Sequence, residues 1–101
     1  MNYRRQLKAG LVKPHRDKAY LKFVDGLGCC ICEQPATHHH LTGHGYGGKG
    51  TKASDYLTIP LCNNHHTGEQ GIHLMGVLSW ELIYGSQFEH VAITLCQART
   101  L

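Results

Sequence analysis

The sequence predicts one small domain of the α+β class. The chain has 101 residues, of which 42% are hydrophobic and 17% are charged, a composition typical of a folded globular domain. A strand-like segment, residues 56–62, lies in a middle region rich in cysteine, histidine and glycine, and the last third has helical patterns. A core of this size gives only modest stability, so an additional stabilising feature is expected.

The positive charge is concentrated at the N-terminus. The net charge is +3, but seven of the ten lysines and arginines fall within the first 22 residues, where Asp17 is the only acidic residue. Residues 1–14 are therefore predicted to form a flexible basic arm, and residues 15–101 the folded domain. Such an arm is typical of nucleic-acid-binding proteins, which makes Arg4 and Arg5 candidate contacts, although many basic arms are simply solvated tails.

The sequence indicates a cytoplasmic protein. No apolar run follows the basic start, so no secretory signal is predicted, and no apolar stretch is long enough to span a membrane. In a reducing compartment, the five cysteines are interpreted as metal ligands before disulfides.

The elements follow in chain order. A short helix is expected within residues 15–28, ending at Gly26 or Gly28. After the strand, residues 71–78 are expected to form one short helical turn. A helix should then begin at Ser79 as N-cap and end at Gly85, before a last helix that opens with Ser86 and Glu89 in capping-box spacing. The aromatic side chains of these helices are interpreted as core, namely Trp80, Tyr84 and Phe88.

Two short motifs predict a structural zinc site. Cys29 and Cys32 form a C-x-x-C motif, and Cys62 and His65 form a C-x-x-H motif, which together supply the four ligands that Zn²⁺ prefers. Cys30 is an alternative to Cys29, because it lies directly beside it. Otherwise Cys30 and Cys96 are interpreted as inert cysteines.

The remaining histidines suggest a second, catalytic site. His66 follows the proposed ligand His65 and must point elsewhere. His39 and His40 are also adjacent, and adjacent side chains on an extended strand face opposite ways. One of them can then bind a metal while the other acts on a substrate, a combination suited to phosphodiester hydrolysis. The alternative is a zinc-stabilised fold with surface histidines.

The order of "CCIC", "HHHLTGHGYGGKG", "SDYLTIPLC" and "NNHH" resembles the HNH, or ββα-metal, nucleases. It is most similar to their phage branch of Ref-like recombination-enhancement nucleases, over about residues 15–84. The resemblance implies a ββα-metal core with structural zinc knuckles and flanking helices. It also implies a bacterial host cell and, through the RecA dependence of that branch, a recombinase filament as a partner.

By this resemblance, His40 matches the general base. His39 and His66 match ligands of a catalytic metal, and His73 can supply a third. The sequence departs from the family at the asparagine that gives HNH its middle letter, because this residue is absent before the C-x-x-H motif. We expect Asp55 to support His40 in its place. The alternative is that Asp55 is a turn residue before the strand.

The glycine-rich loop between the predicted strands is the second candidate for nucleic-acid contact. Its glycines allow backbone amides to approach a phosphate, and Lys49 and Lys52 add positive charge. A flexible hairpin loop without contacts is the alternative. His38 and His44 are interpreted as bystanders, and His90 as a surface or partly packed histidine.

The expected function is metal-dependent endonucleolytic cleavage of nucleic acid, most consistent with DNA. Imidazole ligands accept Zn²⁺, Ni²⁺ or Mn²⁺, whereas Mg²⁺ favours oxygen ligands, so the residues do not select the catalytic cation. The competing hypothesis is a non-catalytic zinc-bound module that binds DNA or protein. It uses the four zinc ligands but gives no role to the other histidines.

Overall fold

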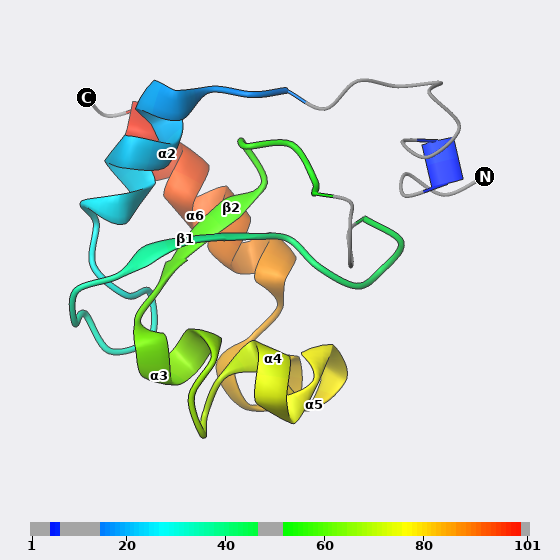
Figure 1. Cartoon of the computed structure of the whole chain (residues 1–101). Helices are drawn as coiled ribbons and strands as arrows, with labels where there is room; N and C mark the ends of the chain where they lie inside the picture. Colours follow the sequence, from blue (N-terminus) through cyan, green and yellow to red (C-terminus); the bar gives the residue numbers. More distant parts are fainter. Residues whose placement is uncertain (1–4, 7–14, 47–51, 100–101) are drawn as a thin grey trace.

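A two-stranded antiparallel hairpin lies at the centre of the structure (Figure 1). The computed structural model describes residues 5–6, 15–46 and 52–99 of the chain. The hairpin and its helices form the α+β domain that the sequence predicts. In chain order the elements are α2 (Lys18–Asp25), β1 (Thr37–His40), β2 (Thr58–Leu61), α3 (Asn63–His66), α4 (Ile72–Met75), α5 (Val77–Tyr84) and α6 (Gln87–Arg99).

The register of the hairpin places the three consecutive histidines on β1. His39 lies opposite Ile59 and His40 opposite Thr58. Because side chains alternate along a strand, His39 faces one side of the hairpin, and His38 and His40 face the other. The predicted strand is confirmed, although β2 is shorter than residues 56–62.

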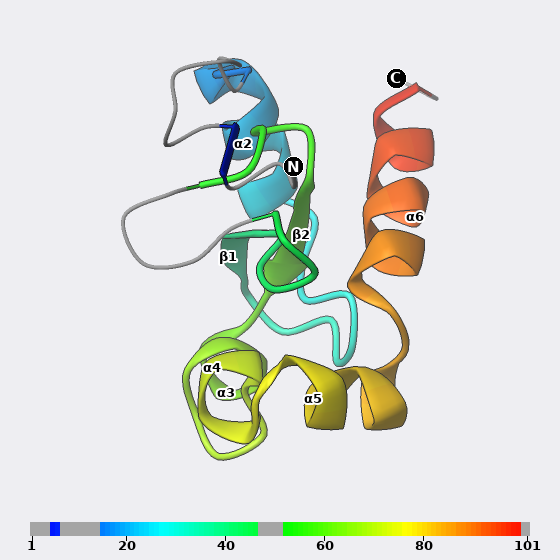
Figure 2. The same ribbon diagram turned by 90° about the vertical axis from the view of Figure 1, so that its right-hand side faces the viewer.

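Helices cover β2 on two sides. Both α2 and α6 contact β2, and Figure 2 shows this strand between them, with α3, α4 and α5 gathered at one end of the hairpin. All four β2 residues are consequently buried. The largest fully buried apolar side chains come from several elements: Leu41, Ile59, Leu61, Ile72 and Trp80.

The first helix lies within the predicted residues 15–28 and ends as predicted. The Asp17 side chain caps α2 by accepting a hydrogen bond of 3.0 Å from the Tyr20 N–H, which satisfies one of the free amides of the first turn. Gly26 is the C-cap. Val24 is buried on the inner face of this helix.

The start of α5 differs from the prediction. The helix begins at Val77, after Gly76 with φ +90° and ψ 150°, so Ser79 lies inside the helix and is not its N-cap. Glycine tolerates this left-handed φ, and the chain can therefore pass from α4 into α5 without a linker. The predicted end at Gly85 is confirmed.

The last predicted helix is also confirmed, although Ser86 bonds to Phe88 rather than to Glu89 of the predicted capping box. The Ser86 Oγ accepts a hydrogen bond of 3.1 Å from the Phe88 N–H at the start of α6. Trp80 is fully buried, as expected, whereas Phe88 is 42% exposed and does not belong to the core. A helical spacing marks one face of a helix, but it does not say whether another element covers that face. Among the described residues, no helix is both long and apolar enough to cross a membrane.

Candidate functional site

Two cysteines and a C-x-x-H motif meet at one end of the hairpin. One potential ligand atom from each of Cys29, Cys32, Cys62 and His65 lies within 4.8 Å of the other three. The Cys32 and Cys62 sulfurs are 3.6 Å apart, and the Cys62 sulfur is 3.2 Å from the His65 Nδ1. A tetrahedral zinc ion with bonds of about 2.3 Å separates its ligands by about 3.7 Å. This cysteine cluster, defined by these four residues, is therefore compatible with structural zinc.

Local backbone turns shape the cysteine cluster. The Glu33 N–H donates to the Cys29 carbonyl at 2.9 Å, and the Ile31 N–H lies 3.4 Å from the Cys29 sulfur. On the other side, Cys62 is the N-cap residue of α3, which turns His65 back toward the sulfurs. The choice between the two neighbouring cysteines is also decided here, because Cys30 does not join the cluster. Burial raises the pKa of the Cys30 thiol to about 12, so it stays protonated and poorly suited to metal binding.

A second group of potential ligands consists of histidines alone. Ring nitrogens of His39, His66 and His73 lie within 4.8 Å of one another, and the Nε2 atoms of His66 and His73 are 3.0 Å apart. His39 is buried, His66 is half-buried and His73 is exposed. This histidine cluster, defined by these three residues, therefore opens to solvent on one side. The structure thus brings together the three residues that the sequence assigned to a catalytic metal.

A close approach between α3 and α4 brings His66 to His73. A Cβ at Gly71 would lie 2.6 Å from the His66 carbonyl carbon, which is closer than side-chain carbons come to backbone. Only glycine fits here without displacement of one of the two segments. Gly71 therefore keeps the seven-residue connection short enough for the two rings to meet.

The donor set of the histidine cluster suits a cation. Burial lowers the pKa of His39 to about 3, so this imidazole is neutral at physiological pH. Burial, together with the neighbouring His73, also lowers the pKa of His66. Metal binding requires neutral imidazoles, and both pKa shifts favour that form. The residues therefore fit a divalent metal.

His40 lies on the opposite side of β1, paired with Asp55. The His40 Nε2 is 2.8 Å from Asp55 Oδ1, and Asp55 is only 3% exposed. The same carboxylate accepts hydrogen bonds from Arg16 at 3.1 Å and from the Asp17 N–H at 2.7 Å. Burial opposes ionisation of Asp55, but the hydrogen bonds from His40 and Asp17 and the charge of Arg16 together lower its pKa. The pair therefore consists of an ionised carboxylate and an imidazole.

Asp55 lies in the turn before β2, as the alternative expected, and its side chain also pairs with His40. Ser54, rather than Asp55, supplies the side-chain bond of the turn, because its Oγ accepts from the Tyr56 N–H at 3.2 Å. Burial lowers the pKa of His40 more than Asp55 raises it. His40 is consequently neutral near pH 7 and available to accept a proton.

Arg16 and Gln87 support the two sides of β1, and sequence reasoning did not identify either role. Arg16 was assigned to the basic segment, yet it bonds to the Ala53 carbonyl at 2.7 Å as well as to Asp55. Gln87 is fully buried, with its Oε1 3.1 Å from the His39 Nε2. Each contact spans more than 35 positions of the chain, so no local spacing pattern could have found it.

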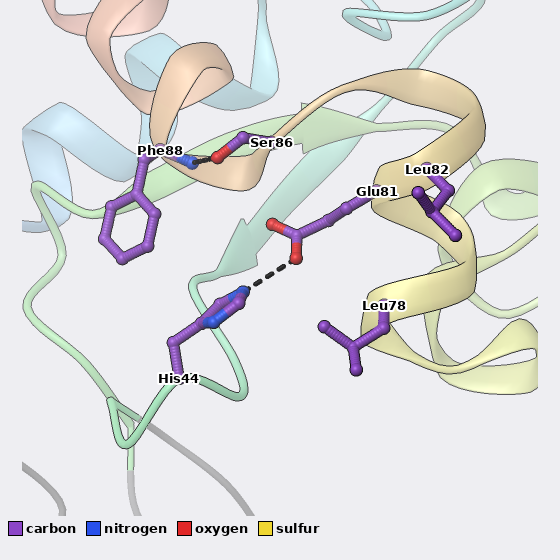
Figure 3. A pocket seen from close by; sticks show the side chains of 6 residues that line it. All are labelled: His44, Leu78, Glu81, Leu82, Ser86 and Phe88. Atoms are coloured by element: carbon purple, nitrogen blue, oxygen red, sulfur yellow. Dashed lines mark hydrogen bonds and ion pairs between the residues drawn. The ribbon is translucent and has the colours of Figure 1, made fainter.

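The remaining histidines have specific partners rather than solvent alone. The His38 Nδ1 is 2.7 Å from Asp25 Oδ1, and the His90 Nε2 is 2.8 Å from the Tyr84 carbonyl. His44 bonds to Glu81 at 2.7 Å across a cavity of about 520 Å³ (Figure 3). The other residues that line this cavity are Leu78, Leu82, Ser86 and Phe88. His38, His44 and His90 do not belong to either ligand cluster.

The predicted nucleic-acid contacts are described only in part. Lys52 and Arg5 are exposed, and the Lys52 carbonyl accepts a bond of 3.3 Å from Arg16 beside the His40–Asp55 pair. Lys52 is thus near the candidate site, and its role in binding stays a prediction. Arg4 and Lys49 lie outside the described residues.

Comparison with known proteins identifies the family of the chain. Residues 8–101 match the family model described as "Protein of unknown function (DUF968)". The chain is also similar to "Uncharacterized protein YdfU" of Escherichia coli (strain K12), with 44% identity over 71 residues. This match covers 69% of the chain and 19% of the relative, so the chain matches about a fifth of that protein's length. No solved structure matches the chain. The chain therefore belongs to the DUF968 family.

Proposed function

We propose that this protein is a metal-dependent endonuclease that hydrolyses phosphodiester bonds in nucleic acid, with DNA as its substrate. One observation carries the proposal: β1 holds a neutral, carboxylate-paired imidazole on one face and a cluster of three imidazoles on the other. His40 and His39, which supply these two parts, are adjacent in the chain. Hydrolysis of a phosphodiester needs a base for water and a positive charge for the leaving oxygen, and the two faces can supply both.

His40 is the residue that activates water in this mechanism. Its Nε2–H donates to the ionised Asp55 carboxylate, which leaves the lone pair on Nδ1. The Nδ1 takes a proton from water as the water oxygen forms a bond to phosphorus in line with the departing 3′ oxygen. The bond from phosphorus to that 3′ oxygen then breaks. Asp55 stabilises the positive imidazolium that forms.

The histidine cluster has the complementary role. His39, His66 and His73 would hold a divalent cation, which supplies Lewis-acid stabilisation of the charge on the phosphate and leaving group. Three protein ligands leave positions free for substrate, as is typical of catalytic metal sites. We assign structural Zn²⁺ to the cysteine cluster, whose four protein ligands complete a tetrahedron.

Substitution of His40 tests the proposal. In the parent protein we expect plasmid DNA or single-stranded circles to be cut with at least one of Mg²⁺, Mn²⁺, Zn²⁺ or Ni²⁺. His40→Ala should reduce the cleavage rate by roughly 100-fold or more, the usual contribution of a positioned acid–base group. Zinc content and DNA affinity should be unchanged, because neither cluster uses His40 as a ligand.

His90→Ala is the matched control, because it removes a half-buried histidine that belongs to neither cluster. It should cut at close to the parent rate. If His40→Ala cuts as fast as the parent, His40 is not the base. If the parent binds DNA without cutting it under any of these cations, the protein is instead a non-catalytic zinc-bound module.

A further inference from the structure

Gln87 has an unusual position for an amide side chain. It is the first residue of α6 and is fully buried. Both the nitrogen and the oxygen of its amide group contact residues on or just after β1. Its Nε2 lies 2.8 Å from the Thr42 carbonyl oxygen, and its Oε1 lies 3.2 Å from the Thr42 nitrogen. The same Oε1 lies 3.1 Å from the His39 Nε2.

The two contacts with Thr42 determine which way the amide points. A carbonyl oxygen can only accept a hydrogen bond, so the Gln87 atom beside the Thr42 carbonyl must be the NH₂ group. The other atom must then be the oxygen, which accepts from the Thr42 N–H. A flipped amide would place an NH₂ group against that N–H and an oxygen against that carbonyl.

This orientation in turn determines which ring nitrogen of His39 carries the hydrogen. The His39 Nε2 faces an oxygen that can only accept, so it must carry the hydrogen and donate it. In a neutral imidazole with its hydrogen on Nε2, the lone pair is on Nδ1. We infer that Gln87 is a positioning residue, which holds His39 so that Nδ1 is its metal-binding atom. The inference rests on the proposed metal site but does not require that the protein cleaves nucleic acid.

Gln87 is itself held by the preceding helix. Its backbone N–H donates to Glu81 Oε2 at 2.8 Å, and Glu81 Oε1 is paired with His44 (Figure 3). The first amides of a helix lack partners within the helix, so this bond satisfies one of them. Glu81 thereby connects the end of α5 to the start of α6 beside the metal-binding strand. Metal-bound histidines commonly donate their second N–H to such a partner, which sets both tautomer and ring orientation.

A test of this inference needs only a metal probe. The full chain, with Cd²⁺ already in place of zinc in the cysteine cluster because thiolates bind Cd²⁺ more tightly, would be titrated with further Cd²⁺ and followed by NMR of isotope-labelled histidine. Scalar coupling between cadmium and nitrogen identifies the ligating atom, and in the metal-free histidine cluster the spectrum reports which nitrogen of His39 carries hydrogen. We expect hydrogen on Nε2 before the further Cd²⁺ is added and coupling to Nδ1 afterwards.

Three variants separate positioning from general stability. Gln87→Met keeps the length of the side chain but lacks the acceptor oxygen, and should weaken Cd²⁺ binding by about 10- to 100-fold. Gln87→Glu keeps an acceptor for the His39 N–H, and with a proton on its other oxygen it can still donate to the Thr42 carbonyl, so in that form it should restore the Nδ1 ligation and most of the affinity. Thr94→Val is the matched control, because it removes a buried hydrogen bond of 2.8 Å from the same helix, away from His39. It should bind Cd²⁺ as the parent does.

Two results would overturn the inference. One is ligation of Cd²⁺ by the His39 Nε2 in the parent, and the other is parent affinity in Gln87→Met. A protein that shows the expected Gln87 dependence but never cuts nucleic acid would refute the proposed nuclease function and leave this inference standing. A protein that cuts nucleic acid but binds Cd²⁺ independently of Gln87 would do the opposite.

Discussion

The cysteine cluster and the histidine cluster take ligands from adjacent residues of α3, yet they differ in almost every physical respect. His65 is buried and lies 3.2 Å from a cysteine sulfur, whereas His66 is half-buried and meets two other imidazoles. The cysteine cluster has four ligands, which complete a tetrahedral site. The histidine cluster has three and ends in the exposed His73. A single helical turn thus contributes one histidine to a cluster of four potential ligands and the next to a cluster of three.

The two clusters also differ in how they connect the elements of the fold. The cysteine cluster joins the segment before β1 to the start of α3 after β2, at the end of the hairpin where Thr37 pairs with Leu61. The histidine cluster shares only α3 with it and takes its other two residues from β1 and α4. A structural metal in the cysteine cluster would add folding free energy directly, and the proposed catalytic metal site could then leave coordination positions open to substrate.

The largest effect is expected when the cysteine cluster is broken. Cys62→Ala should abolish cooperative folding, because structural zinc contributes about 10–16 kcal/mol in small zinc domains, comparable with the whole stability of such a protein. Thermal melting and zinc content measure the effect. Cys96→Ala, at an exposed position on α6, should melt like the parent. Unchanged melting and zinc content in Cys62→Ala would remove the structural role from this cluster.

The second test uses the neighbouring histidine. His66→Ala should fold and keep one zinc ion, but it should lose the second metal equivalent together with cleavage, because it is a ligand of the histidine cluster. Calorimetric metal titration and a nicking assay measure the two losses, with His65→Ala as the contrasting variant that should fail to fold. If His66→Ala and His65→Ala fold equally well and lose the same amount of metal, the two clusters do not have different roles.

A smaller effect on stability is expected at Asp55, the buried carboxylate that pairs with His40. Asp55→Asn should destabilise the protein by about 2 kcal/mol at pH 7, because all three partners of the carboxylate are donors and an amide has only one acceptor oxygen. The folded pKa of Asp55 is lowered, so its stabilisation is present above the unfolded value of about 3.9 and is lost as the pH falls through the folded pKa.

The parent and Asp55→Asn should therefore differ in unfolding free energy at pH 7 and converge below about pH 4. Urea unfolding at several pH values measures this. A difference that stays constant down to pH 3 would show that Asp55 acts by packing and not by its charge.

The smallest effect is expected at Lys52. Lys52→Gln should weaken DNA binding slightly and reduce the slope of log affinity against log salt by about one, as expected for loss of one phosphate contact. Folding and metal content should not change, because the exposed Lys52 participates in the Arg16 contact through its backbone carbonyl alone. An unchanged salt slope would place the DNA on another face of the domain.

Local signals explain why much of the fold could be predicted. Apolar periodicity and glycine identified α2 and the end of α5, because these features act over a few neighbouring residues. The predicted start of α5 at Ser79 was wrong. Serine has a general preference for N-cap positions, but here Gly76 already provides the turn into the helix. The short α3 was not predicted, since four residues show no periodicity.

The sequence by itself indicated the candidate ligands: the spacing of the two short cysteine motifs predicted the zinc ligands, and resemblance to the HNH nucleases implied the histidine set. Metal ligands at short spacing are a local chemical signal, and adjacent histidines on a strand must face opposite ways. Only the tertiary structure decided between Cys29 and Cys30, brought His73 to His39, and placed Arg16 and Gln87 on either side of β1. These contacts join residues far apart in the chain, and they depend on how α2, α4 and α6 pack around one hairpin, which no local pattern encodes.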